Sequence, residues 1–125
     1  MNRRFVLALA LIVWRPALGE TALEMQSWCR QIVSGPILAN DTVYVGTTFN
    51  DGVCWGSFAA IQQLSRIVDQ NGIMLLRFCP PPDSTRVQFI KIFMRYADQH
   101  PEEAHHDFAK LALRALVEAF PCSAR

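Results

Sequence analysis

Four cysteines are the residues with the clearest chemistry in this 125-residue chain: Cys29, Cys54, Cys79 and Cys122. Zinc sites usually contain close pairs of cysteines, and these four are spread widely along the chain. An even number of cysteines in a small exported domain is typical of disulfides. We therefore expect two disulfides, no metal among the cysteines and no free thiol for catalysis.

The spacing of the cysteines bears on how they pair. Four cysteines allow three pairings. In an antiparallel helical hairpin, residues equidistant from the turn come level, because both helices rise at the same rate. This geometry favours Cys29–Cys54, centred near residue 41, and Cys79–Cys122, centred near residue 100, with each bridge near the open end of its hairpin. The main rival, Cys54–Cys79 with Cys29–Cys122, stays open because the segment 70–78 could run back along the second helix.

A cluster of histidines and glutamates follows residue 99 and could bind a metal ion: His100, Glu102, Glu103, His105 and His106. Several of these residues are neighbours on a helix. No cysteine or third well-spaced ligand joins them, and acidic residues in a first turn are ordinary at the positive end of a helix dipole. We therefore expect a solvated helix start, with no metal or cofactor.

A nucleophilic serine is not expected either. Ser57 follows Gly56 but lacks the second glycine of a nucleophile elbow, and it falls within a predicted helix. The chain also has no glycine-rich phosphate loop. The sequence therefore predicts no catalytic residue, and a protein that is not an enzyme.

The first nineteen residues resemble a secretion signal. Arg3 and Arg4 precede an unbroken apolar run over 5–14, and 17–19 offers small residues for cleavage. The run is too short for a permanent anchor, which needs roughly 20 residues. We expect residues 1–19 to be removed and residues 20–125 to form one exported domain.

The charge of that domain is close to neutral. The whole chain has a formal net charge of +1. Without Arg3, Arg4 and Arg15, nine basic residues face eleven acidic ones, a net charge of about −2. No cluster of Lys or Arg remains, which argues against binding to nucleic acid or to an anionic membrane.

Apolar periodicity and helix signals predict an all-α fold, a small disulfide-stapled bundle of about four helices. Capping-box patterns, Thr21 with Glu24 and Thr85 with Gln88, start the first and third helices. The expected limits are Thr21 to Gly35, Asn50 or Asp51 to Asn71-Gly72, Thr85 to about Asp98, and His100-Pro101 to Phe120. A long ordered loop is expected over 36–50, and 73–78 could pack extended across the bundle.

The predicted third helix is apolar around most of its circumference. Only Lys91, Arg95 and Asp98 form a polar stripe. Such a helix is either central in its own fold or covered by a partner. The second alternative predicts a homodimer through helix three.

Several landmarks in this order resemble one family: Cys54-Trp55-Gly56-Ser57-Phe58, Phe78-Cys79-Pro80, Thr85-x-x-Gln88, His100-Pro101-Glu102 and Ala119-Phe120-Pro121-Cys122. Over roughly residues 25–122 the chain resembles the Rap/Tai family of periplasmic immunity proteins for type VI secretion amidase effectors. It departs from the family pattern at Ser57, where a Tyr is usual, at Ala60, where a Gly is common, and in the longer stretch 36–50.

The resemblance implies a small helical periplasmic protein that binds and inhibits a peptidoglycan amidase effector, often as a homodimer. The candidate partner-binding residues are Asp98, Gln99, His100, Glu102, Glu103 and His106, on the predicted turn between the last two helices. A second candidate is the loop 36–50 with Tyr44 and Phe49. The alternative functions are a periplasmic stress chaperone and an orphan envelope interaction domain of the same fold.

Overall fold

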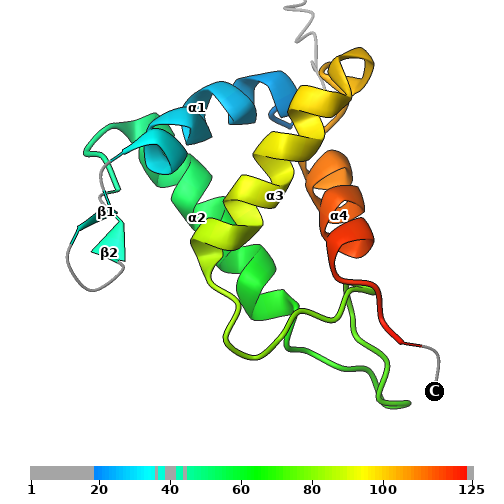
Figure 1. Cartoon of the computed structure of the whole chain (residues 1–125). Coiled ribbons are helices and arrows are strands. Elements are labelled where there is room, and N and C mark those ends of the chain that lie inside the picture. Colours follow the sequence, from blue (N-terminus) through cyan, green and yellow to red (C-terminus); the bar gives the residue numbers. More distant parts are fainter. Residues whose placement is uncertain (1–18, 36, 39–41, 44, 124–125) are drawn as a thin grey trace, which may run out of the picture.

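The computed structural model describes residues 19–35, 37–38, 42–43 and 45–123, without the side chains of the two short strands (Figure 1). The elements are α1 (Ala22–Ser34), β1 (Ile37–Leu38), β2 (Thr42–Val43), α2 (Phe49–Leu64), α3 (Arg86–Gln99), a 3-10 turn η1 (Pro101–Glu103) and α4 (Phe108–Ala119). The predicted all-α fold of four helices is confirmed. The predicted secretion signal lies outside the described residues apart from Gly19.

Three of the four helices begin with a capping box, in which a threonine and an acidic or amide side chain satisfy each other's backbone amides. Thr21 and Glu24 start α1, and Thr85 and Gln88 start α3, as predicted. The third capping box starts α2 at Thr48, whose hydroxyl accepts from the Asp51 amide. The prediction that this helix begins at Asn50 or Asp51 was therefore slightly late.

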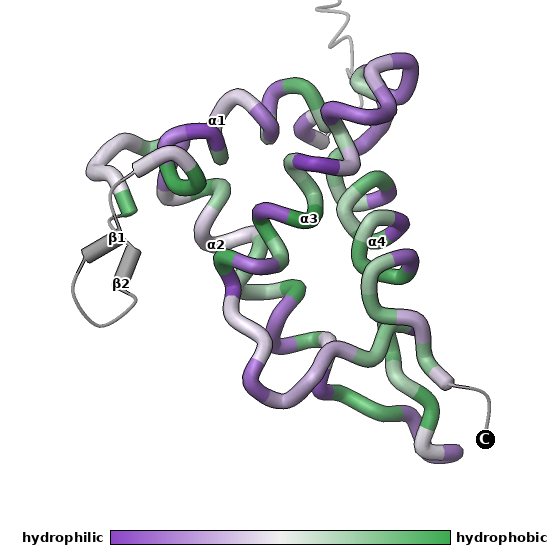
Figure 2. The backbone as a smooth tube through the Cα atoms, viewed as in Figure 1, coloured by the Kyte–Doolittle hydropathy of each residue, from purple (hydrophilic) through white to green (hydrophobic). Residues whose placement is uncertain are grey.

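Helix α3 lies between α1 and α2 on one side and α4 on the other, so all three neighbours pack against it (Figure 1). Most of its apolar residues are buried and the other two, Val87 and Ile92, are half-buried. The buried ones are Phe89, Ile90, Phe93, Met94, Tyr96 and Ala97. Hydrophilic and hydrophobic residues alternate along α3 and α4 (Figure 2), as expected for helices with one face in a core. Because the other helices of the same chain pack over these residues, the apolar composition of α3 does not by itself indicate a homodimer through this helix.

An aromatic cluster joins three helices at the centre. The ring of Phe58 on α2 lies 5.7 Å from that of Phe93 on α3 and 5.4 Å from that of Phe108 on α4. Phe93 and Phe108 meet edge to face at 5.3 Å. Such geometry suits the charge distribution of aromatic rings. The cluster fixes how α2, α3 and α4 cross.

Two predicted helix limits were wrong. Helix α2 ends at Leu64, and Ile67 and Val68 lie beyond it and are exposed. Its buried face is already complete by Ile61, and the Ser65 hydroxyl bonds the carbonyl of Gln62. Helix α4 begins at Phe108, so His100-Pro101 starts only the short turn η1.

The segment 65–85 connects α2 to α3 without a regular helix. Val68 and Met74 form an isolated antiparallel bridge, closed by a turn in which Gly72 has φ +75°, a conformation that suits a residue without Cβ. The Asp69 carboxylate accepts from two backbone amides of this turn. The segment 73–78, which could have packed extended across the bundle, instead begins as the returning arm of this hairpin, where the Leu75 amide donates to the carbonyl of Ile67. Of its residues, Phe78 is the one fully buried.

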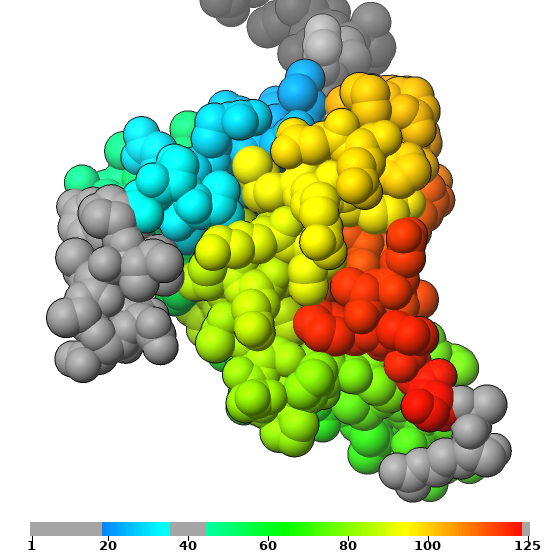
Figure 3. All heavy atoms as spheres, in the orientation of Figure 1, coloured from blue at the N-terminus to red at the C-terminus, as the bar shows by residue number. Residues whose placement is uncertain are grey.

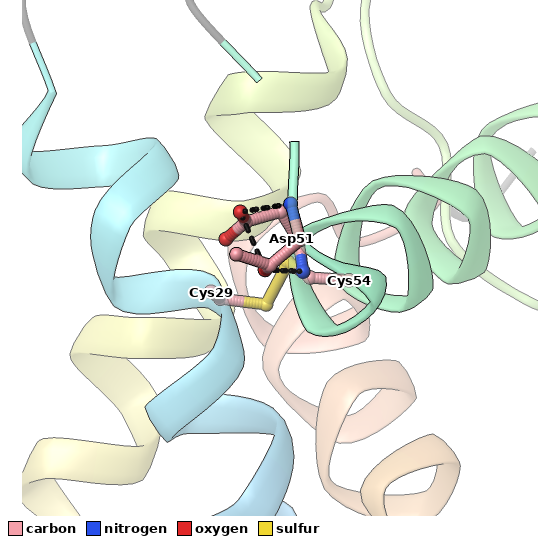
Figure 4. Close-up of a disulfide and its surroundings, with 4 residues drawn as sticks. Cys29, Asp51 and Cys54 are labelled. Atoms are coloured by element: carbon pink, nitrogen blue, oxygen red, sulfur yellow. Dashed lines mark hydrogen bonds between the residues drawn. A yellow bond between two sulfur atoms is a disulfide. The ribbon is translucent and has the colours of Figure 1, made fainter. Parts of the chain in front are cut away.

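Two disulfides join Cys29 to Cys54 and Cys79 to Cys122, the pairing that the spacing favours. The expectation that the first bridge lies near the open end of an antiparallel hairpin was wrong. Helix α2 leaves α1 at a wide angle (Figures 1 and 4), and the bridge lies where the two helices cross, close to their connection. The second bridge closes the ends of the α3–α4 hairpin, where Phe78 also pairs with Pro121.

Candidate partner-binding surface

The six predicted binding residues lie together in the connection between α3 and α4, which we call the tip (residues 98–107). In Figure 3 the tip forms the upper right corner of the molecule. Pro101 suits the first position of its 3-10 turn, because that position needs no backbone donor. The His100 amide bonds the carbonyl of Tyr96, and the Glu103 amide bonds the carbonyl of His100. These bonds give the tip a defined backbone path.

The tip is also tied to the start of α1. The amide of Ala22 donates to the carbonyl of His106 at 2.9 Å, and that of Leu23 donates to the carbonyl of Ala104 at 3.0 Å. In return the amide of Phe108 donates to the carbonyl of Glu20. First-turn amides of a helix otherwise lack partners within the helix, so these bonds stabilise both elements. A preorganised tip would lose little conformational entropy on binding.

Glu103 faces inward and holds the tip to α4. Its carboxylate accepts from the Arg114 guanidinium and lies 3.4 Å from Nδ1 of His106. The pKa of Arg114 is raised, first by its hydrogen bond with the Tyr96 hydroxyl and then by the charge of Glu103. These contacts occupy Glu103 and His106 within the chain.

Glu102 faces outward, beside the half-buried His100. The Glu102 side chain is 67% exposed, and its Oε1 lies 3.2 Å from Nδ1 of His100. The pKa of Glu102 is lowered, first by its own backbone amide and then by His100. The imidazole of His100 stacks on the Tyr96 ring, with centroids 4.2 Å apart. Glu102 is therefore an ionised carboxylate at neutral pH, held on a supported and accessible turn.

The last turn of α3 completes the tip. Asp98 accepts a hydrogen bond from Gln26 of α1, whose side chain is buried. Gln99 is exposed at the end of the helix. In the tip Asp98, Gln99 and Glu102 are thus exposed, and Asp98 is also bonded to α1. His100, Glu103 and His106 are half-buried and make contacts within the chain.

Three supporting residues escaped sequence reasoning: Gln26, Tyr96 and Arg114. Gln26 and Arg114 lie on helices other than the one that ends in the tip, so no local spacing points to them. Tyr96 lies in α3, one turn before His100. Its position in the apolar pattern led us to assign it to the core alone. A search for polar partners one turn along the same helix would have found only Tyr96.

The tip is strongly acidic. It contains Asp98, Glu102, Glu103 and Asp107 and no lysine or arginine of its own. Arg114 balances one of these charges from α4. Such a surface favours a partner that offers cationic groups or hydrogen-bond donors.

Three tip side chains could also be tested as metal ligands. Among the described residues, ligand atoms of His100, Glu102 and Glu103 lie within 4.8 Å of one another. The carboxylate of Glu103 is already bonded to Arg114. A cation there would compete with that guanidinium, so the arrangement favours an ion-pair network over a metal site.

The second predicted binding region is only partly visible. Tyr44 lies outside the described residues. Phe49, the first residue of α2, is 82% exposed, which is unusual for a large apolar side chain and can mark a contact.

Comparison with known proteins yields one family. A sequence model of the family described as Rap1a immunity proteins matches residues 23–122. No curated protein and no solved structure matches the chain. Within the described ranges no helix has the length and apolar character needed to cross a bilayer.

Proposed function

Because the chain belongs to the Rap1a family of immunity proteins, we propose that it binds one effector of a type VI secretion system, a peptidoglycan amidase, and inhibits it. The match over residues 23–122 is the observation that carries this proposal. The amidase comes from the resemblance of the sequence landmarks to the Rap/Tai proteins. In this proposal residues 1–19 export residues 20–125 to the periplasm, where such an enzyme would reach the cell wall.

We further propose that the tip enters or covers the cleft of the effector. The tip supports this because Gln99 and Glu102 are exposed, while the backbone of the tip is held by bonds to α1 and by the contacts of Glu103. The protein would act by shape and charge without performing a reaction. Inhibition by a rigid inserted turn needs little change in the inhibitor on binding.

The proposal includes no homodimer contact through α3. The resemblance implies that such proteins often bind as homodimers. In this chain the exposed residues of α3 are all polar, and its apolar residues are buried or half-buried within the chain. We therefore do not place a dimer contact on α3.

The binding proposal can be tested with a Cys/His hydrolase encoded next to this chain. Isothermal calorimetry should detect a tight complex between that enzyme and residues 20–125 with intact disulfides. Glu102→Gln should weaken binding by about 1–2 kcal/mol, because it removes an exposed charge at the proposed contact. Absence of binding by the unmodified protein would reject this partner.

A matched control separates the tip from general loss of charge. Glu118→Gln removes an exposed glutamate from the last turn of α4, and it should leave the affinity unchanged. A second control, Phe49→Ser, tests the other candidate region. If Phe49→Ser weakens binding and Glu102→Gln does not, the contact lies at the start of α2, and the tip assignment is wrong while the immunity role stands.

A further inference from the structure

The two disulfides differ in how far a reagent can reach them. Cys29 and Cys54 are both fully buried. Cys79 is half-buried and Cys122 is exposed. Thiol–disulfide exchange requires a thiolate to approach one sulfur directly. By residue exposure, Cys122 is therefore the most accessible of the four cysteines.

A cavity of about 910 Å³ lies beside the exposed bridge and is lined by both of its cysteines. The hairpin contributes Val68, Ile73 and Met74 to its wall, and α4 contributes Val117. Small thiols are much smaller than this volume. The cavity gives an attacking thiol room to approach the bridge.

Opposite charges accompany the two bridges. Arg77 lines the same cavity as Cys79 and Cys122, and a guanidinium close to a sulfur favours its thiolate form. Asp51 lies beside the Cys29–Cys54 bridge (Figure 4), and the residue is 3% exposed. A buried carboxylate disfavours a second negative charge nearby. Electrostatics thus promotes exchange at one bridge and opposes it at the other.

We propose that Cys79–Cys122 is an exchangeable disulfide, that Cys122 is the sulfur attacked by an external thiol, and that Cys29–Cys54 is inert while the protein is folded. This inference does not depend on the proposed function. The co-reactant is a thiol, either a small molecule or the dithiol of an oxidoreductase.

The exchange has two steps. A thiolate attacks Sγ of Cys122, the bond to Cys79 breaks, and Cys79 leaves as a thiolate that takes up a proton. A second thiol then attacks the external sulfur of the mixed disulfide and releases Cys122 as a thiol. The protein gains two electrons and two protons, and two external thiols become one disulfide.

The structural consequence is local. The bridge holds the chain after α4 against the chain before α3, together with the bond from the Cys79 amide to the carbonyl of Phe120. The aromatic cluster and the buried bridge do not involve these residues. Phe120 also packs on the ring of Phe89. Reduction should therefore loosen residues 121–123 and leave the crossing of α1 and α2 intact.

The test is timed reduction of the native protein with glutathione, followed by alkylation and peptide mapping. Cys79 and Cys122 should be labelled at least about 100-fold faster than Cys29 and Cys54, because the buried pair reacts only after an opening of the fold. The glutathione adduct should be found on Cys122. In denaturant the two pairs should react at similar rates, which would show that the fold causes the difference.

Equal native rates, or faster labelling of Cys29 and Cys54, would overturn the proposal. The contribution of charge has its own comparison. Arg77→Gln should slow exchange several-fold, and Arg66→Gln, which changes a neighbouring exposed arginine outside the cavity wall, should not. An adduct found mainly on Cys79 would also contradict the assigned point of attack.

Discussion

The two disulfide-linked halves of this protein are built on different plans. In the first, α1 and α2 cross at a wide angle, and the bridge is buried at their crossing. In the second, α4 returns beside α3, and the bridge closes the chain ends outside the core. The first bridge is part of the packed interior, and the second ties down a surface. The same kind of covalent bond thus stabilises core packing in one half and holds the chain ends together in the other.

Removing each bridge separately should give the largest effect and the clearest test of that difference. Loop-closure entropy alone predicts about 3.5 kcal/mol for a separation of 25 residues and about 4 kcal/mol for 43. Cys29→Ala with Cys54→Ala also leaves space in the core, which adds to the cost. We expect this pair to lower the free energy of unfolding by about 5 kcal/mol, against about 3–4 kcal/mol for Cys79→Ala with Cys122→Ala.

Urea unfolding of both variants measures these losses. Unchanged denaturant slopes would show that the comparison concerns the folded state. If the Cys79–Cys122 variant were clearly the less stable, loop length would outweigh burial, and the distinction between the two halves would fail.

Glycine positions test how tightly the first half is packed near its bridge. A Cβ at Gly46 would lie 2.1 Å from Oδ2 of Asp51, whose carboxylate caps the start of α2. Gly46→Ala should therefore cost about 1–2 kcal/mol, the usual value of a lost helix cap. Gly56, in the same helix, has open space around its Cβ position.

Gly56→Ala is the matched control, and it should stabilise the protein by about 0.5–1 kcal/mol, because alanine restricts the unfolded chain. Thermal unfolding of the two variants gives both signs in one experiment. If Gly46→Ala left the melting temperature unchanged, Asp51 could move without loss of stability, and its cap at the start of α2 would contribute little.

The smallest expected effect is the loss of stability in acid that comes from two glutamates, Glu24 in the first half and Glu102 in the second. The pKa of Glu24 is lowered, first by the backbone amide of Thr21 and then by its hydroxyl. A carboxyl whose pKa is lower in the folded state stabilises the fold above the unfolded value of 4.5, and the gain is lost as pH falls through the folded pKa. Glu102 has the same sign.

Glu24→Gln should therefore lower stability at neutral pH and match the unmodified protein at strongly acidic pH, as measured by urea midpoints across the titration. Gln retains the geometry of the capping box. Glu102→Gln should change stability less, because the groups that bond its carboxylate all lie within the tip. A larger effect from Glu102 would mean that the tip supports the fold of the second half.

Local signals in the sequence predicted the fold well. The caps at Thr21 and Thr85 act within four residues, so spacing alone reveals them. The cap at Thr48 was missed because its partner is Asp51, while the pattern sought has Glu or Gln. The end of α2 depends on where its buried face stops, and that is decided by packing against other helices.

The place of the tip in the fold was predictable from the sequence, but the contacts of its residues were not. The polar turn after Gln99 marked the tip. Whether a carboxylate faces solvent or an arginine depends on contacts across the fold: Glu103 meets Arg114 of α4, while Glu102 stays outward. Sequence spacing contains no information on that choice, so the six predicted residues could not be sorted before the structure was known.

The measurement that bears most directly on the account is hydrolysis of purified peptidoglycan by the neighbouring amidase in the presence of residues 20–125. We predict a stoichiometric loss of wall cleavage, with full inhibition by Glu118→Gln and weaker inhibition by Glu102→Gln at the same concentration. Undiminished cleavage, with the enzyme active and the disulfides of the added protein intact, would contradict inhibition of that enzyme by this fold.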